Sequence, residues 1–148
     1  MHRNTGRMAE NAEVVRRLYA AFSRGDTATT RELTDPDIEW VNPADAVERG
    51  TRKGFDEYQV ALGKVREVFG DAEIEVDRLV ESGDRVAAKV RMHVHLDARG
   101  FETVVDGSHL WTLRDGRAVR FEWFTDPQRA VEALAGTSSE TPRGRIDE

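Results

Sequence analysis

The sequence predicts an α+β domain in which the helices come first and an antiparallel sheet follows. Apolar residues recur at helical spacing as far as residue 69, and after Gly70 they recur at every second position. Turn-forming residues around Gly83, Gly100 and Gly116 divide this second half into strands. Helices and strands that occupy separate parts of a chain typically form two layers, with the helices on one face of the sheet.

The composition is that of one ordinary globular domain of 148 residues, 39% hydrophobic and 34% charged. The net charge is −6, and acids and bases are interspersed, so the basic patch typical of nucleic-acid-binding proteins is missing. The chain has no cysteine, which excludes disulfides, thiolate metal sites and cysteine nucleophiles. No apolar run approaches the roughly 20 residues of a membrane helix, and no secretion signal is present. We therefore expect a cytoplasmic protein without nucleic-acid or membrane partners.

The folded unit is expected at residues 9–135. Residues 1–8 are polar and aperiodic, and residues 136–148 collect threonine, serine, proline, glycine and charge. Segments of this composition bury too little apolar surface to stay ordered, so both are expected to be disordered tails.

The first helix is predicted from four apolar residues on one helical face: Val15, Leu18, Tyr19 and Phe22. It should end at Gly25, since glycine tolerates the positive φ found at helix ends. Asp26 is a suitable N-cap for a short second helix to about Leu33, which Pro36 ends.

A short strand is expected at residues 38–42, followed by a polar loop. A third helix should run from Phe55 to Phe69, with one apolar stripe formed by Phe55, Tyr58, Leu62, Val65 and Phe69. Four antiparallel strands are then predicted at about 73–82, 85–97, 101–114 and 117–125. Residues 127–135 would add a helical turn or two.

The last hairpin has two possible registers. If Asp115 and Gly116 form a two-residue turn, Trp111 lies opposite an arginine. If residues 114–116 form a three-residue loop, a common hairpin type, Trp111 lies opposite Val119. Burial favours the second register because it gathers apolar side chains on one face. That face would carry His109, Trp111, Val119, Phe121 and Trp123.

The preceding hairpin raises a question about Arg78. Alternation from the turn at Gly83 places these residues on one face: Ile74, Val76, Val80, Val86, Val90 and Met92. Arg78 would fall on the same face. An unpaired buried charge is very costly, so a bulge or a rim position is favoured over an inward arginine.

Five segments carry a resemblance to a known family: Val15 to Phe22 with Arg24-Gly25-Asp26, Asp35 to Trp40, Gly54, Gly83 to Val86, and Trp111 to Arg117. They resemble the SnoaL-like branch of the nuclear-transport-factor-2-like superfamily, which includes ketosteroid isomerases and polyketide cyclases. The resemblance implies a cone-shaped curved antiparallel sheet wrapped around three N-terminal helices, with a pocket at the open end. It also implies a homodimer through the outer sheet face, which an exposed Phe124 would support.

The catalytic positions implied by this resemblance hold other residues here. The first-helix tyrosine of ketosteroid isomerases falls at Leu18, one residue before Tyr19. Their aspartate base falls at Asn42, whose amide cannot take a proton from carbon, and their second aspartate falls at His109. The last-strand aspartate of SnoaL-type cyclases falls at or next to Trp123.

His109 is the candidate acid–base group. An imidazole with the ordinary pKa of about 6.5 exchanges protons near neutral pH, and Asn42 could orient a substrate carbonyl beside it. A core histidine held by hydrogen bonds is the alternative. The ligand-facing wall is expected from Trp40, Tyr58, Met92, Trp111, Phe121 and Trp123. Such a wall suits a flat polycyclic ligand, although core packing accounts for the same residues.

Other polar residues are expected to be solvated or structural. His93 and His95 have a spacing that can suit a metal, but they share a face with basic residues and are interpreted as solvent or interface residues. Asp45 and Glu48 should be solvated loop charges, with the role of an alternative base left open. No metal or cofactor signature is present, so neither a metal nor a cofactor is predicted.

Two functions remain open from the sequence. One is an isomerase, cyclase or lyase that acts by proton transfer on a hydrophobic carbonyl or polycyclic compound. The other is a non-catalytic ligand-binding or scaffold dimer. Fold does not imply function, so the site must decide between them. The expected partners are a small hydrophobic molecule and a second copy of the chain.

Overall fold

The computed structural model describes residues 2–44, 46, 48, 50–69, 73–95 and 102–139. Its helices are α1 (His2–Arg24), α2 (Thr27–Glu32), α3 (Phe55–Phe69) and α4 (Arg129–Ser139). Its strands are β1 (Thr34–Asn42), β2 (Gly50–Lys53), β3 (Glu73–Ser82), β4 (Arg85–His95), β5 (Glu102–Arg114) and β6 (Arg117–Phe124). No described helix is long and apolar enough to cross a membrane.

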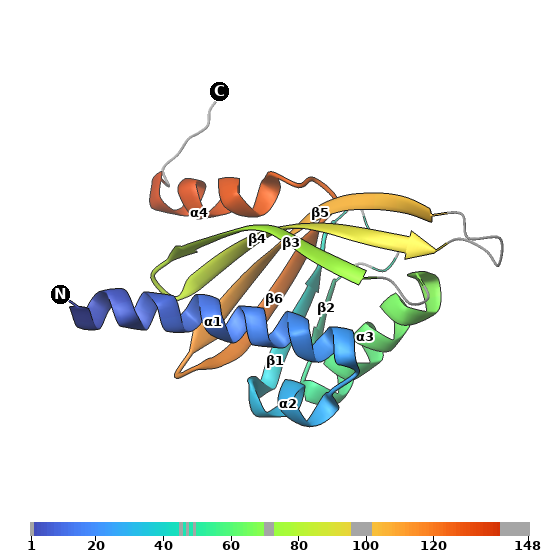
Figure 1. Cartoon of the computed structure of the whole chain (residues 1–148), viewed down its shortest axis with the longest axis horizontal. Helices are drawn as coiled ribbons and strands as arrows, with labels where there is room; N and C mark the ends of the chain where they lie inside the picture. Colours follow the sequence, from blue (N-terminus) through green and yellow to red (C-terminus); the bar gives the residue numbers. More distant parts are fainter. Residues whose placement is uncertain are drawn as a thin grey trace.

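The six strands form one curved sheet in the order β2-β1-β6-β5-β4-β3. Helices α1, α2 and α3 lie along its inner side, and α4 lies on the opposite side (Figure 1). This confirms the predicted α+β class with helices enclosed by a curved sheet. The apolar stripes of α1 and α3 meet the inner face, where Val15 and Tyr58 are buried with Ile38 of β1.

The sheet is mixed rather than wholly antiparallel. Strands β1 and β6 pair in parallel, with Trp40 opposite Phe121. Strand β2 pairs with β1 where a polar loop was expected. Both differences have a physical reason. The β1–β6 pair joins distant segments, so no hairpin turn sets its direction, and β2 is an exposed four-residue edge strand without an apolar alternation.

The helix boundaries follow local signals closely. Gly25 ends α1 with a φ of 66°, and the Asp26 carboxylate accepts a hydrogen bond from the Thr29 amide at 3.0 Å, which caps α2 as predicted. Helix α3 has the predicted bounds. Helical backbone extends past both ends of the expected unit at 9–135, because α1 begins at His2 and α4 ends at Ser139. Each extension continues an existing helix, and helix propagation is cooperative.

The register of the last hairpin differs from the favoured prediction. Asp115 and Gly116 form a two-residue turn with φ values of 53° and 77°, so Arg114 pairs with Arg117. A register shift then leaves Val119 unpaired, and beyond it Trp111 pairs with Phe121. A bulge of one residue restores the alternation that burial requires. The expected inner residues therefore share a face, except that Ala118 replaces Val119 among the buried core residues.

A bulge also lies in β3, as predicted near Arg78. The pairing shifts between Val76 and Arg78, and Arg78 is exposed. The shift reverses the faces beyond it, so Leu79 joins the inner core while Val80 packs against the cluster under α4. The placement of Val80 on the inner face was therefore wrong, because the consequence of the bulge continues along the strand.

Helix α4 covers part of the outer sheet face. Ala130 and Leu134 pack on Ala87 and Leu110, and Phe124 is half-buried against the same cluster. The Ser108 hydroxyl donates to the Asp126 carbonyl at 2.7 Å and accepts from the Ala130 amide at 3.1 Å, which holds the start of the helix. Phe124 is therefore not the exposed residue that the sequence suggested, because α4 packs over it.

Candidate functional site

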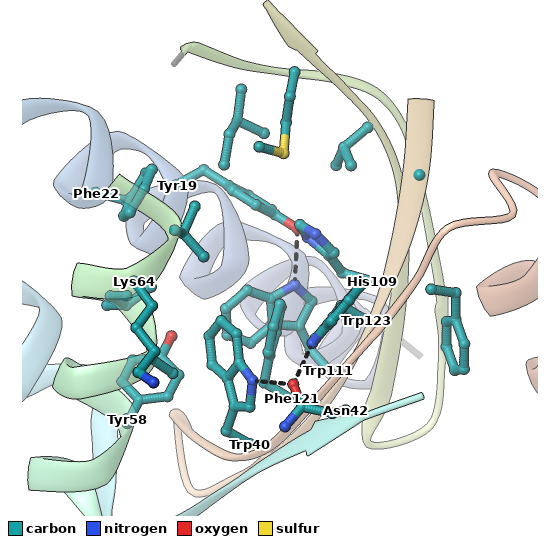
Figure 2. Close-up of a pocket in the computed structure, with 18 of the residues that line it drawn as sticks. Tyr19, Phe22, Trp40, Asn42, Tyr58, Lys64, His109, Trp111, Phe121 and Trp123 are labelled. Atoms are coloured by element: carbon teal, nitrogen blue, oxygen red, sulfur yellow. Dashed lines mark hydrogen bonds between the residues drawn. The ribbon is translucent and has the colours of Figure 1, made fainter. Parts of the chain in front are cut away.

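The curved sheet and helices α1 and α3 enclose a cavity of about 580 Å³. Its wall is mainly aromatic and aliphatic (Figure 2). The eight residues predicted for the site all line it: Trp40, Asn42, Tyr58, Met92, His109, Trp111, Phe121 and Trp123. The three tryptophans line the cavity and do not fill it. Whether these residues bind a ligand or do chemistry remains a prediction.

The aromatic wall is built from adjacent strands. Trp40 of β1, Phe121 of β6 and Trp111 of β5 form one cross-strand row, with Phe121 between the two indoles at centroid distances of 4.7 and 4.6 Å. The ring of Tyr58 on α3 meets the ring of Trp40 edge-on, with 5.7 Å between the two ring centroids. These tilted and edge-to-face contacts hold the rings rigidly. The result is a stiff apolar surface of several rings.

Asn42 is the centre of a hydrogen-bonded cluster at one end of this wall. Its Oδ1 accepts hydrogen bonds from the indole nitrogens of Trp40 and Trp123, both at 2.8 Å (Figure 2). Its Nδ2 donates to Glu48 Oε2 and to the Gly50 carbonyl, both at 3.3 Å. Indole nitrogens only donate, so the shared atom must be the amide oxygen.

These four bonds occupy the full hydrogen-bonding capacity of the Asn42 side chain. The residue therefore orients two tryptophans rather than a substrate carbonyl, which corrects the role expected for it. Glu48 is not a freely solvated loop charge either. Arg52 binds its carboxylate through two bonds of 2.7 and 2.9 Å, and this contact lowers the pKa of Glu48. Such a carboxylate is unsuited to act as a base, and Asp45 lies outside the described residues.

His109 belongs to a second hydrogen-bonded cluster in the cavity wall, with Tyr19 and Trp111. Its Nδ1 lies 2.6 Å from the Tyr19 hydroxyl, and the Trp111 indole nitrogen donates to that hydroxyl at 3.0 Å. Burial raises the pKa of Tyr19, so the phenol is protonated at neutral pH. Tyr19 lines the cavity, as does Leu18. The helical stripe on the first helix contained Tyr19, and this was the signal that could have placed it in the site.

Burial lowers the pKa of His109 to about 3. Desolvation disfavours the charged imidazolium, and no carboxylate of the described residues forms a hydrogen bond or ion pair with the ring to offset it. The expectation of an imidazole that titrates near neutral pH was therefore wrong. At neutral pH His109 is an uncharged ring and a weak base, suited to hydrogen bonding rather than to proton transfer.

Two further side chains extend the polar part of the cavity wall. Tyr58 has no hydrogen-bond partner for its hydroxyl among the described residues, although only 3% of the residue is exposed. Lys64 also lines the cavity, and like Tyr58 it comes from α3 (Figure 2). Its ammonium group lies 3.8 Å from the Glu48 carboxylate. Lys64 was not predicted, because a lysine off the apolar stripe of a helix gives no signal for a site.

His93 of β4 does not line this cavity. His93 Nε2 is 2.9 Å from Glu75 Oε1 on the neighbouring strand. The side chain of His95 lies outside the described residues. Within the described ranges, no group of three or more histidine, aspartate or glutamate side chains is placed to hold a metal ion.

A family model described as a SnoaL-like domain matches residues 15–121. The chain belongs to the SnoaL-like domain family. No curated protein matches it. Solved structures do, among them TerC co-crystallised with polyporic acid, with 30% identity and a TM-score of 0.68 over 85% of this chain and 98% of that one.

Two other solved structures extend the comparison. Bal32a, from a soil-derived mobile gene cassette, shares 27% identity over 78% of this chain and 88% of its own, with a TM-score of 0.68. A protein from Jannaschia sp. CCS1, named as a SnoaL-like polyketide cyclase, shares 22% identity over 91% and 95% of the two chains, with a TM-score of 0.70. The last likeness supports the fold alone.

Proposed function

We propose that this protein binds a flat, hydrophobic aromatic or polycyclic molecule in the cavity of the cone. The observation that carries the proposal is the cavity of about 580 Å³ beside a rigid wall of indole and phenyl rings. This volume lies within the usual range for small-molecule sites, which is roughly 300–1,000 Å³. A site that served only for packing would be filled by its tryptophans. TerC, whose structure contains polyporic acid, supports a small organic ligand for this fold.

The site favours binding over acid–base catalysis. At neutral pH His109 is an uncharged, weak base, and the amide of Asn42 has no free hydrogen-bonding group left to orient a substrate carbonyl. The second candidate function, an isomerase, cyclase or lyase acting by proton transfer on a hydrophobic carbonyl or polycyclic compound, would need His109 to serve as its acid–base group despite this lowered pKa. Under that alternative, His109→Ala abolishes turnover and leaves ligand affinity nearly unchanged, whereas unchanged turnover excludes it.

Binding can be tested by calorimetric titration of the purified protein with polyporic acid and a panel of polycyclic aromatic ketones. The informative variant is Leu62→Trp, because Leu62 of α3 lines the cavity and an indole there would fill part of it. The matched control is Val60→Trp on the same helix, where the wild-type side chain is 45% exposed and does not line the cavity.

We expect at least one compound to bind the wild-type protein and the Val60→Trp variant equally well. The Leu62→Trp variant should lose at least tenfold in affinity while its far-ultraviolet circular dichroism stays unchanged. Equal binding to both variants would place the ligand outside the cavity. Failure of the whole panel would favour the scaffold alternative.

A homodimer through the outer sheet face remains part of the proposal. Helix α4 already covers the part of that face around Leu110, so a partner would pack on the remaining part of β3, β4 and β5. That part carries Arg91, which lies within ion-pair distance of both Asp77 and Asp106. Sedimentation velocity at low and high salt measures whether the protein dimerises through this face. A monomer at all protein concentrations would exclude the dimer.

A further inference from the structure

The Trp111–Tyr19–His109 cluster allows only one orderly arrangement of its protons. The indole nitrogen of Trp111 can only donate, so it fills one side of the Tyr19 hydroxyl with a group that cannot accept the phenolic proton. The remaining partner of that hydroxyl is His109 Nδ1, at 2.6 Å. If Tyr19 donates to Nδ1, the neutral imidazole carries its own proton on Nε2.

The opposite arrangement leaves a group unsatisfied. If His109 donated from Nδ1 to the Tyr19 oxygen, that oxygen would accept from both the histidine and the indole, and its own proton would have no acceptor. Tyr19 is buried, with 8% of its surface exposed, and has no other side-chain hydrogen bond in the described part of the chain. A stranded buried donor is strongly disfavoured, so the first arrangement should dominate roughly tenfold or more.

His109 Nε2 is the end of this relay. It has no hydrogen-bond partner among the described residues, and it is not one of the fully enclosed polar atoms that lack one. The His109 side chain lines the cavity. The proton on Nε2 therefore reaches the space that a ligand would occupy.

We propose that Trp111 and Tyr19 are positioning residues that fix His109 in its Nε2–H form, so that the cavity wall at His109 offers a donor and selects ligands that present an oxygen acceptor there. This inference rests on the proposed function for the ligand, while the proton arrangement is a property of the protein alone. Because burial lowers the pKa of His109, the ring stays neutral at neutral pH and does not gain a second N–H donor by protonation. A carbonyl or a deprotonated enol oxygen fits such a site, and a ligand N–H group does not.

Nitrogen NMR of protein carrying ¹⁵N-labelled histidine tests the relay without any ligand. The two ring nitrogens have separate shifts in the two tautomers, so the spectrum reports which nitrogen carries the proton. We expect the wild-type His109 signal to show the Nε2–H form. Tyr19→Phe removes the donor to Nδ1 and should give a mixture. Trp111→Phe opens the second side of the hydroxyl and should also loosen the preference.

The matched control is Trp40→Phe. It deletes an indole nitrogen from the same cavity wall, but one that donates to Asn42 instead of Tyr19. It should leave the His109 tautomer unchanged. An Nδ1–H form in the wild-type protein, or an equal effect of Trp40→Phe and Trp111→Phe, would overturn the relay.

Ligand selectivity tests the second half of the inference with two tricyclic probes of similar shape. 9-Fluorenone presents a carbonyl acceptor, and carbazole presents an N–H donor. Both are titrated against the wild-type protein and against Tyr58→Phe, because the Tyr58 hydroxyl can accept as well as donate. We expect fluorenone to bind at least tenfold more tightly than carbazole in the Tyr58→Phe background. Adding Tyr19→Phe should reduce this ratio to about threefold or less.

The outcomes separate the two proposals. Equal binding of both probes overturns the selectivity for acceptors while leaving the cavity as a binding site. If neither probe nor any compound of the earlier panel binds, the proposed function fails, and the NMR spectrum alone decides whether the relay exists.

Discussion

Replacing Asn42 with aspartate tests whether the amide is a structural hub or a free group of the site. Asn42→Asp keeps the shape of the side chain and keeps an oxygen for the two indole donors. It loses the two bonds donated by Nδ2, and it places a second oxygen about 3.3 Å from the Glu48 carboxylate. The variant also restores the aspartate that ketosteroid isomerases are expected to hold at this position.

The expected loss of stability can be worked out from these contacts. Two lost hydrogen bonds cost about 2 kcal/mol. Two carboxylates at this distance repel by about 1 kcal/mol in water and about 5 kcal/mol in a partly buried setting, and the adjacent Arg52 favours the lower value. The charged acceptor strengthens the two indole bonds and offsets about 1 kcal/mol. The net loss is roughly 2–4 kcal/mol, a large share of an ordinary folding free energy.

Urea unfolding at pH 7 and pH 5, followed by tryptophan fluorescence, measures this effect. Repulsion raises the pKa of the new carboxyl in the folded state, so the folded protein binds more protons than the unfolded chain and the loss should be smaller at pH 5. The double variant Asn42→Asp with Glu48→Gln, compared with Glu48→Gln alone, should recover about 1–2 kcal/mol. If Asn42→Asp lowers the free energy of unfolding by less than about 1 kcal/mol at pH 7, or by more at pH 5 than at pH 7, Asn42 does not have the structural role proposed for it.

Three further predictions concern stability. Burial raises the pKa of Glu81 above its ordinary 4.5, so the folded state binds this proton more tightly than the unfolded chain does. The free energy of unfolding should therefore fall as the pH rises above 4.5. In urea unfolding, Glu81→Gln should flatten that dependence. A Cβ at Gly107 would lie 2.9 Å from the Phe124 carbonyl oxygen, so Gly107→Ala should lower the free energy of unfolding by about 1–3 kcal/mol. Gly63 on α3 has open space around it, so Gly63→Ala should raise the free energy of unfolding by up to about 1 kcal/mol in the same assay. Ser108→Ala should strand a backbone amide at the start of α4 and speed hydrogen exchange in that helix, and unchanged exchange would show that the hydroxyl does not hold it.

Much of the fold could be predicted because its signals are local. The bounds of α3 follow from one apolar stripe, and the start of α2 follows from the carboxylate of Asp26. The parallel pairing of β1 with β6 and the edge strand β2 could not be predicted in this way. Neither has a turn or an alternation of its own, since both depend on how the sheet curves and closes.

The inner face of the last hairpin shows how a wrong register can yield mostly the right residues. The β5–β6 hairpin needs one extra, unpaired residue between Trp111 and Phe121 so that both rings face the interior of the cone. The sequence suggests a three-residue loop for it, whereas the structure forms a two-residue turn and leaves Val119 unpaired. Both solutions insert one residue, and burial of the aromatic rings demands it in either case.

The sequence by itself determined which strand residues form the aromatic wall of the cavity, because the alternation of apolar residues along a strand assigns each one to a face. The tertiary structure decided what those side chains can do. The hydrogen bonds of Asn42 come from residues up to 81 positions away, and the partner of His109 lies 90 positions away on α1. Desolvation and hydrogen-bond partners depend on how distant segments pack, so the same His109 that the sequence offered as an acid–base group is, in the folded protein, a neutral donor at the end of a fixed relay.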